Sequence, residues 1–244
     1  MTRSIGSYGK AQVFEHFFGS EVAAMGTTRL PVCGNGVNYS CTLEGTFAPT
    51  EDEPGGVLAA TTNAGDDSSI AYTIGKFKPV DAGCWMEARF KADSVLLTAM
   101  WAGFAETVDA TTPVMPDEYA VATLAVGAGG HAGFLYDPDA TTDRWLCCAA
   151  DGAIAAAGSP LECGAQTAVA DQYDVVRVEI DQVGTAQCWL AVKDGALKLW
   201  KTWKTCVNPE DTFFALVMFE NRSAVARCPE IDYFNAGGFV DWER

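Results

Sequence analysis

Short alternations of hydrophobic and polar residues recur along the chain and predict β-strands. The clearest alternation covers residues 174–181, where Val176, Val178 and Ile180 are separated by charged residues. Successive side chains of a strand point to opposite faces, so this segment has one apolar face and one solvated face. We expect a strand here that forms part of a half-buried sheet.

The segments that follow predict a hairpin and then a fully covered strand. Residues 187–193 and 196–201 read as two strands, and Asp194-Gly195 between them is typical of a two-residue type I′ turn. Residues 213–219 are apolar at every position, which indicates a strand covered on both faces.

The remaining pattern predicts an all-β chain. Further strands are expected at residues 12–18, 39–47, 57–62, 69–74, 84–91, 96–104, 118–126, 132–136, 144–148 and 230–234. A short helix at residues 153–157 stays open, and no convincing amphipathic helix is present. Many short strands separated by turns favour a jelly-roll β-sandwich of two antiparallel sheets. We predict this domain at residues 39–244, preceded by an extended N-terminal arm and irregular segment at residues 1–38.

The charge balance excludes some partners. The 244 residues include 32 acidic and 16 basic ones, for a formal net charge of −16. Such a chain repels polyanions, so we expect no direct contact with nucleic acid or an anionic membrane surface. No apolar run approaches the roughly 20 residues of a membrane-spanning helix.

The cysteines predict structural thiols. All nine of them lie outside Cys-x-x-Cys pairs, and the chain has only two histidines, His16 and His131. This spacing fits neither a zinc site nor a compact disulfide framework. We expect reduced, packed thiols and synthesis in a reducing cytoplasm, without a secretory signal.

Several segments together resemble a known family. They are residues 55–58, 77–79, 85–90, 102–105, 173–181, 219–221 and 230–234. Their order is similar to that of tailed-phage virion proteins with a concanavalin A-like jelly roll, over about residues 45–236. The resemblance implies a particle component, most often a capsid decoration or cement protein that binds the major capsid protein. It also implies a homo-oligomer, with a trimer as our expectation, on the virion surface after synthesis in the host cytoplasm.

Catalysis is not predicted. Laminarinase-type glycosidases share this fold and carry Glu-x-Asp-x-x-Glu on one strand, because retaining chemistry needs two carboxyl groups close together. Here Glu230 and Asp232 match the first two positions, but Asn235 occupies the third and cannot act as a general acid. The chain also has no Gly-x-Ser-x-Gly motif, P-loop or Gly-x-Gly-x-x-Gly motif.

Metal and cofactor binding are not predicted either. Legume-type lectins hold metals with a strand carboxylate pair, an Asn and a His, and residues 119–124 carry no acidic side chain. Acidic runs at residues 51–53, 66–67 and 137–139 could hold a hard cation weakly, but we interpret them as solvated turns.

The best candidate contact patch is aromatic and basic. It comprises Trp189, Trp200, Trp203 and Lys201, in the most basic stretch of an acidic chain. Exposed together, these side chains would contact a partner capsid protein or a glycan, whereas packed tryptophans would belong to the core. We predict a non-enzymatic capsid decoration protein; the alternative is a host-glycan-binding, lectin-like module on a head fibre or tail.

Overall fold

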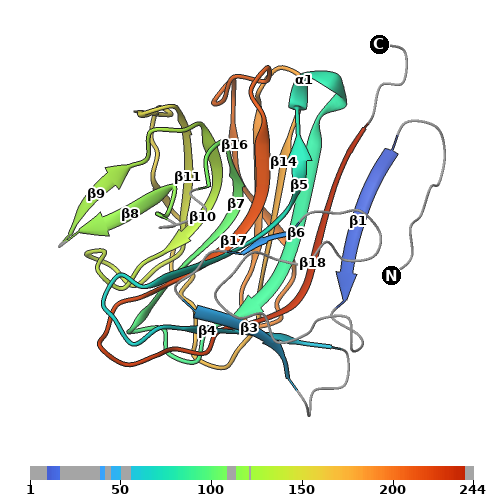
Figure 1. Ribbon diagram of the computed structural model, residues 1–244. Helices are drawn as coiled ribbons and strands as arrows, with labels where there is room; N and C mark the ends of the chain where they lie inside the picture. Colours follow the sequence, from blue (N-terminus) through green and yellow to red (C-terminus); the bar gives the residue numbers. More distant parts are fainter. Residues whose placement is uncertain are drawn as a thin grey trace.

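Two antiparallel sheets face each other in the computed structural model (Figure 1), which describes residues 10–16, 39–41, 45–50, 56–108, 114–120 and 122–239. The elements are β1 (Lys10–His16), β2 (Tyr39–Cys41), β3 (Gly45–Pro49), β4 (Leu58–Thr62), β5 (Ser69–Phe77), α1 (Pro79–Ala82), β6 (Cys84–Lys91), β7 (Thr98–Ala105), β8 (Asp117–Ala120), β9 (Thr123–Val126), β10 (His131–Tyr136), β11 (Leu146–Asp151), β12 (Ile154–Ala155), β13 (Leu161–Glu162), β14 (Asp174–Ile180), β15 (Ala186–Ala191), β16 (Lys198–Trp203), β17 (Phe213–Asn221) and β18 (Glu230–Phe239). The predicted all-β, antiparallel sandwich is confirmed.

Sheet A has one buried and one half-exposed face. Its strands follow the order β16-β15-β14-β6-β18-β4-β3, and β1 also pairs with β18. In β14 and β6, buried residues alternate strictly with partly exposed ones, as the sequence pattern predicts. The outer face of sheet A is therefore a surface of polar and aromatic side chains.

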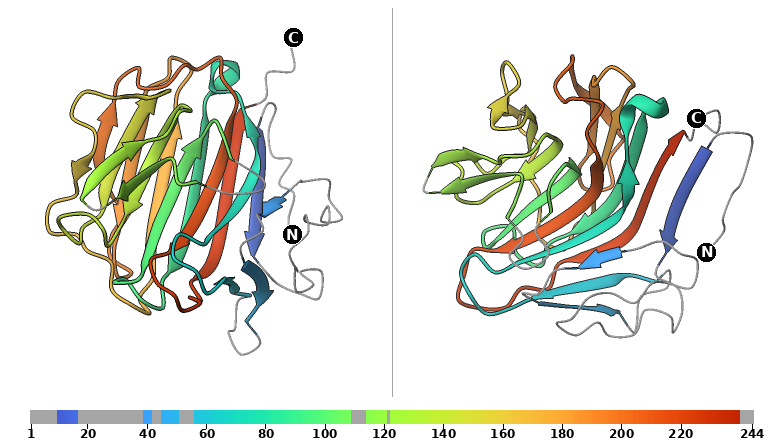
Figure 2. Two further views of the ribbon diagram at one scale, coloured as in Figure 1. Left: turned by 60° about the vertical axis from the view of Figure 1, so that its left-hand side comes forward. Right: turned by 45° about the horizontal axis from the view of Figure 1, so that its top comes forward.

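The central strands of sheet B are covered on both faces. Its strands follow the order β12-β11-β10-β7-β17-β5-β2, and β13 also pairs with β11. In β17, Val217 and Phe219 pack between the sheets, whereas Leu216 and Met218 belong to a second cluster on the outer face. The β8–β9 hairpin lies on the side of the molecule remote from β1 in Figures 1 and 2, and its Tyr119 packs against that second cluster. This confirms the prediction of a strand buried on both sides.

The core between the sheets is aromatic. The Phe90 ring on sheet A meets the rings of Trp145 and Phe219 edge-on, with centroids 6.0 and 5.9 Å apart. All three side chains are fully buried. Burial of one such side chain contributes roughly 1.5–3 kcal/mol, so these contacts hold the two layers together.

Two local predictions were wrong, and one open possibility is excluded. The turn after β15 is a type I′ turn, but its left-handed residues are Lys193 and Asp194, one position earlier than predicted, and β16 begins only at Lys198. The expected strand at residues 118–126 is the β8–β9 hairpin, and Ala122 in its turn has a φ of 63°. The short helix that the sequence left open at residues 153–157 does not form, because this stretch contains β12.

Part of the predicted N-terminal arm belongs to the sandwich. The expected strand at residues 12–18 corresponds to β1, which pairs with β18 from Lys10 to His16. The rest of residues 1–38 lies outside the described part of the chain. Among the described residues, no helix is long and apolar enough to cross a bilayer.

Six thiols pack as predicted. The cysteines whose side chains the structure describes are free, and those with buried side chains are Cys84, Cys147, Cys148, Cys163, Cys188 and Cys206. Burial raises the pKa of the Cys206 thiol to about 11, and it also raises the pKa of Cys84. Among the cysteines whose side chains are described, Cys228 alone is exposed, which departs from the prediction of packed thiols.

Candidate functional site

The predicted aromatic patch is divided between two faces. Trp203 is 3% exposed and lies in the core, where its Nε1 is 3.2 Å from Cys147 Sγ. Trp200 is partly buried and packs against the same core, and Lys201 Nζ lies 4.6 Å from the Trp203 ring centroid. Trp189 follows the alternation of β15 onto the outer face of sheet A. The three tryptophans therefore do not form one exposed surface, because alternation along β15 and β16 separates them.

Trp189 instead belongs to a cluster around Arg177 on the outer face of sheet A. Arg177 donates hydrogen bonds to Glu179 from Nε at 2.8 Å and to Glu87 from Nη1 at 3.2 Å. Its guanidinium carbon lies 5.2 Å from the Trp85 ring centroid and 6.0 Å from that of Trp189. Burial lowers the pKa of Arg177, but the hydrogen bonds and charges of the two carboxylates outweigh it and raise the pKa overall. Arg177 is thus a fixed cation between two aromatic rings.

A hollow of about 450 Å³ adjoins this cluster. Trp85, Arg177, Glu179, Thr185 and Gln187 are among its lining residues, and they come from neighbouring strands β6, β14 and β15 and the turn before β15. The lining combines an aromatic ring with carboxylate, guanidinium, hydroxyl and amide groups. Such a hollow suits a polar ligand with an apolar face and several hydroxyl groups.

A second cluster of paired charged side chains on the same face contains the two candidate acids, Glu230 and Asp232. Lys91 Nζ pairs with Glu230 at 2.9 Å, and Arg89 pairs with Asp232. The Tyr173 ring lies 3.9 Å from the Arg89 guanidinium carbon, and its hydroxyl donates to Glu230 at 3.2 Å. Each carboxylate is therefore bound by a basic side chain instead of facing the other across a cleft, which does not match a glycosidase pair.

The structure also joins residues that sequence reasoning left apart. His131 is 1% exposed, and its Nε2 lies 3.0 Å from Asp117 Oδ1. Its Nδ1 is 2.9 Å from the Gly129 carbonyl oxygen, and the Trp101 ring meets it edge-on at 5.5 Å. This buried group fixes β8 to β10. Asp117 and His131 are 14 residues apart in the sequence and the β8–β9 hairpin separates them, so no strand or helix periodicity could have predicted their contact.

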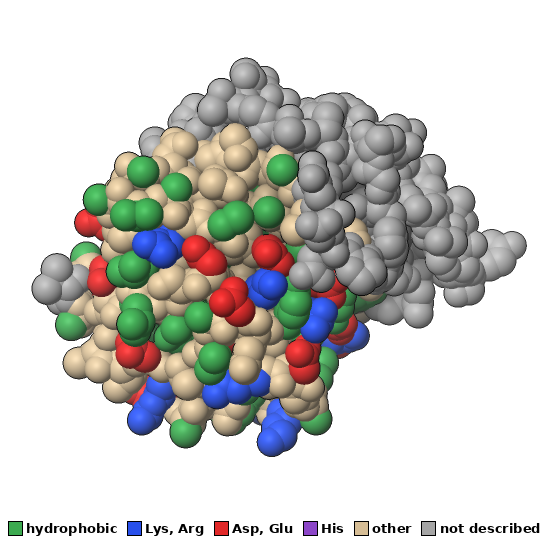
Figure 3. Space-filling model, turned by 90° about the horizontal axis from the view of Figure 1, so that it is seen from below, with side chains coloured by type: hydrophobic (Ala, Val, Ile, Leu, Met, Phe, Trp, Pro, Cys, Tyr) green, Lys and Arg blue, Asp and Glu red, His purple; other side chains and the backbone are tan. Residues whose placement is uncertain are grey.

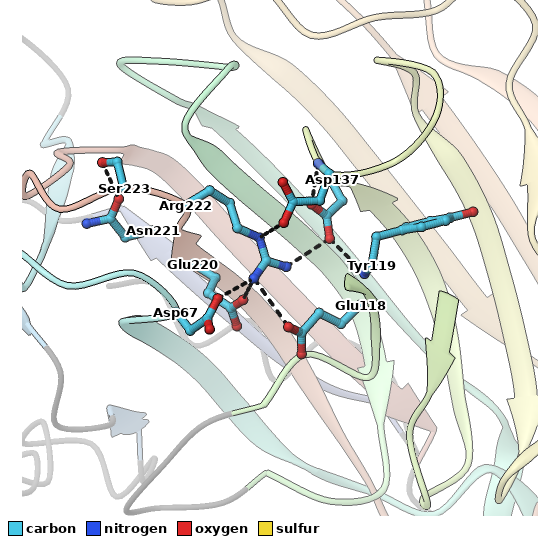
Figure 4. A network of polar contacts seen from close by, with 9 residues as sticks. Asp67, Glu118, Tyr119, Asp137, Glu220, Asn221, Arg222 and Ser223 are labelled. Atoms are coloured by element: carbon cyan, nitrogen blue, oxygen red, sulfur yellow. Dashed lines mark hydrogen bonds and ion pairs between the residues drawn. The ribbon is translucent and has the colours of Figure 1, made fainter. Parts of the chain in front are cut away.

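Arg222 gathers acidic residues at the end of β17 (Figure 4). Its side chain is 4% exposed and donates to Asp67 at 2.8 Å, Glu118 at 3.2 Å and Asp137 at 2.9 Å, and it also contacts Glu220. Burial raises the pKa of Glu220 to about 8, against the opposing charge of Arg222. Two of the acidic runs interpreted as solvated turns, residues 66–67 and 137–139, thus contribute carboxylates to one cation, whereas residues 51–53 lie outside the described part of the chain.

Comparisons with known proteins agree on the fold. No family model matches the sequence, and no curated protein matches it. A protein of unknown function from Shewanella oneidensis MR-1 matches with a TM-score of 0.64 and 12% identity, over 100% of this chain and 92% of the other. Peanut lectin matches with a TM-score of 0.57 and 10% identity, over 93% and 97%. A legume lectin-like domain from Entamoeba histolytica matches with a TM-score of 0.51 and 10% identity, over 82% and 89%.

The chain therefore has a legume lectin-like, concanavalin A-like jelly-roll fold. At 10–12% identity this similarity establishes the architecture alone. The same fold hosts unrelated functions, so function has to be argued from the surface. On the face shown in Figure 3, basic and acidic side chains are interspersed among hydrophobic ones.

Proposed function

We propose that this protein is a non-enzymatic virion protein that docks on the capsid shell through the outer face of sheet A. The observation that supports the proposal is that other side chains already hold the arginines of that face in place. Arg177 and Arg89 are each held between carboxylates and an aromatic ring before any partner binds. The phage setting, the major capsid protein as partner and the trimer come from the sequence resemblance.

Preorganisation is what makes this face suitable for docking. Immobilising a long, mobile side chain at an interface costs about 0.5–1.5 kcal/mol. Salt bridges and ring contacts already hold the two arginines of this face, so docking would not incur that cost for them. Exposed Arg and Trp side chains are also the types that contribute most to protein interfaces.

Sedimentation with undecorated phage capsids tests this proposal. We expect the wild-type protein to pellet with the particles, and the double variant Arg177→Ala/Trp189→Ala to remain in the supernatant. Ile154→Ala is the matched control, because Ile154 is 76% exposed on β12, which belongs to the other sheet. The proposal fails if the wild type is not retained, or if the double variant binds as well as the control.

A glycan is the second candidate ligand, and the hollow at Trp85 is the observation that favours it. Sugars stack their apolar faces on aromatic rings and bond their hydroxyl groups to polar side chains, and this hollow offers both. A capsid partner would cover about 800 Å² of this face, whereas a glycan needs only the hollow.

A glycan array separates the two candidates. If a glycan is the ligand, Trp85→Ala removes the array signal and leaves protein stability unchanged. Trp203→Ala is unsuitable for this test, because Trp203 is in the core and its loss would destabilise the fold. An array without signal, together with retention on capsids, would reject the glycan candidate.

A further inference from the structure

The β8–β9 hairpin packs against the outer face of sheet B and takes no part in the proposed function. Tyr119 and Leu124 of the hairpin contact the apolar cluster on that face, which includes the buried Trp101. Asp117, the first residue of the hairpin, is 1% exposed and meets His131 at the start of β10. This pair of titratable side chains therefore lies where the hairpin joins the body of the sandwich.

The contacts of the His131 ring define how many protons the pair holds. Nδ1 is 2.9 Å from the Gly129 carbonyl oxygen, which can only accept, so Nδ1 carries a hydrogen. Nε2 lies 3.0 Å from Asp117 Oδ1, and neither atom has a hydrogen-bond partner elsewhere among the described residues. In a neutral ring Nε2 bears a lone pair. Its close approach to a buried carboxylate oxygen therefore requires a second proton, on Nε2 or on Asp117.

Three further titratable groups are packed around this pair. Cys148 on β11 lies beside Asp117, and Tyr119 is on the hairpin; burial raises the pKa of both, so both stay neutral up to about pH 8.5. Glu106, which follows β7, accepts a hydrogen bond from the Gly130 N–H at 2.8 Å. Among the described residues, no Lys or Arg pairs with Asp117 or Glu106, so no fixed cation can replace the proton.

We propose that the proton shared by His131 and Asp117 latches the β8–β9 hairpin, and that the latch opens as the pH rises. Imidazole is the side chain that changes its charge between about pH 5 and pH 8. The docked hairpin needs this proton, whereas an opened hairpin, with both groups in water, does not, so docking weakens as the pH rises. Without the proton, two lone pairs would face each other in a buried site. Opening uncovers the apolar cluster around Trp101.

Hydrogen–deuterium exchange of the full-length protein, followed by mass spectrometry, tests the latch. Exchange is measured at about pH 5.5 and about pH 8.5, on either side of the range in which imidazole titrates, and is corrected for the pH dependence of unprotected amides. In the wild type, the amides of β8 and β9 should exchange about five- to a hundredfold faster at the higher pH, because a buried group that has lost its partner destabilises docking.

The Asp117→Asn variant distinguishes a latch from a purely structural contact. The asparagine amide can donate to Nε2 of a neutral ring, so the hairpin of this variant should stay protected at both pH values. His131→Gln cannot titrate and should likewise remove the pH response. Glu106→Gln is the control, because it keeps an acceptor for the Gly130 N–H and should retain the response of the wild type.

The proposal is overturned if the wild-type hairpin exchanges at the same corrected rate at both pH values. It is also overturned if Asp117→Asn keeps the pH response, or if its hairpin is as poorly protected at both pH values as that of the wild type at the higher pH. Loss of the response in Glu106→Gln would assign it to the wrong carboxylate and would overturn the proposal as well. Capsid and glycan binding are measured on sheet A, so the latch and the proposed function can fail separately.

Discussion

Replacing Asp174 with asparagine should change how the stability of this protein depends on pH. Asp174 is 2% exposed at the start of β14. Its Oδ2 accepts a hydrogen bond from Trp145 Nε1 at 2.9 Å, and its Oδ1 accepts one from the Lys193 backbone N–H at 2.8 Å. Burial nevertheless raises the pKa of Asp174 from 3.8 to about 6, and these hydrogen bonds oppose the shift only in part.

The sign and size of the effect follow from this pKa. Between about pH 4 and pH 6 the folded protein binds more protons at Asp174 than the unfolded chain does, so the contribution of this group to stability falls as the pH rises through that window. The difference between 3.8 and about 6 corresponds to about 3 kcal/mol. Asparagine does not titrate and removes this dependence.

Urea unfolding at a series of pH values from acidic to neutral measures the effect. The free energy of unfolding of the wild type minus that of Asp174→Asn should fall by about 3 kcal/mol between about pH 3 and pH 7. The control is Asp171→Asn, because Asp171 is an exposed residue just before β14. If the difference between the two free energies stays constant over this range, or rises with pH, Asp174 is not a buried carboxyl group with a raised pKa.

Three further predictions concern the thiols, the core and the candidate acids. Native protein should expose at most Cys33, Cys41 and Cys228 to a thiol reagent, and the six buried thiols should react only after unfolding, as counted by mass spectrometry. In chemical denaturation, Phe219→Ala should lower the free energy of unfolding by about 3–5 kcal/mol, because Phe219 is buried in the core. Ile154→Ala should change it by no more than about 0.5 kcal/mol, because Ile154 is 76% exposed. Reducing-sugar assays should detect no polysaccharide cleavage, and cleavage abolished by Glu230→Gln would contradict the non-enzymatic assignment.

Strands with a regular solvent pattern could be predicted from the sequence. In β14 the alternation of Val176, Val178 and Ile180 with charged residues reports directly which face is buried. The uniformly apolar residues 213–219 of β17 likewise indicate cover on both faces. These signals are local, because the face on which a side chain lies follows from its position along its own strand.

Features that depend on distant contacts could not be predicted. The turn after β15 is displaced by one residue, and tertiary contacts hold it there: Asp174 accepts from the Lys193 N–H, and Asp194 pairs with Arg89. The acidic cluster at Arg222 joins residues up to 155 positions apart, so no spacing reveals it. The tryptophans do not form a single surface because Trp203 pairs with the buried Ala186 and faces the core, and the sequence of β16 alone does not reveal this pairing.

Oxidative footprinting of the particle-bound protein by mass spectrometry tests the central claim most directly, because it reports which face is covered. If the outer face of sheet A docks, Trp85 and Trp189 should become protected on binding, while the exposed Ile154 on β12 of sheet B keeps its reactivity. Protection of Ile154 with unchanged labelling of Trp85 and Trp189 would contradict the account and place the contact on sheet B.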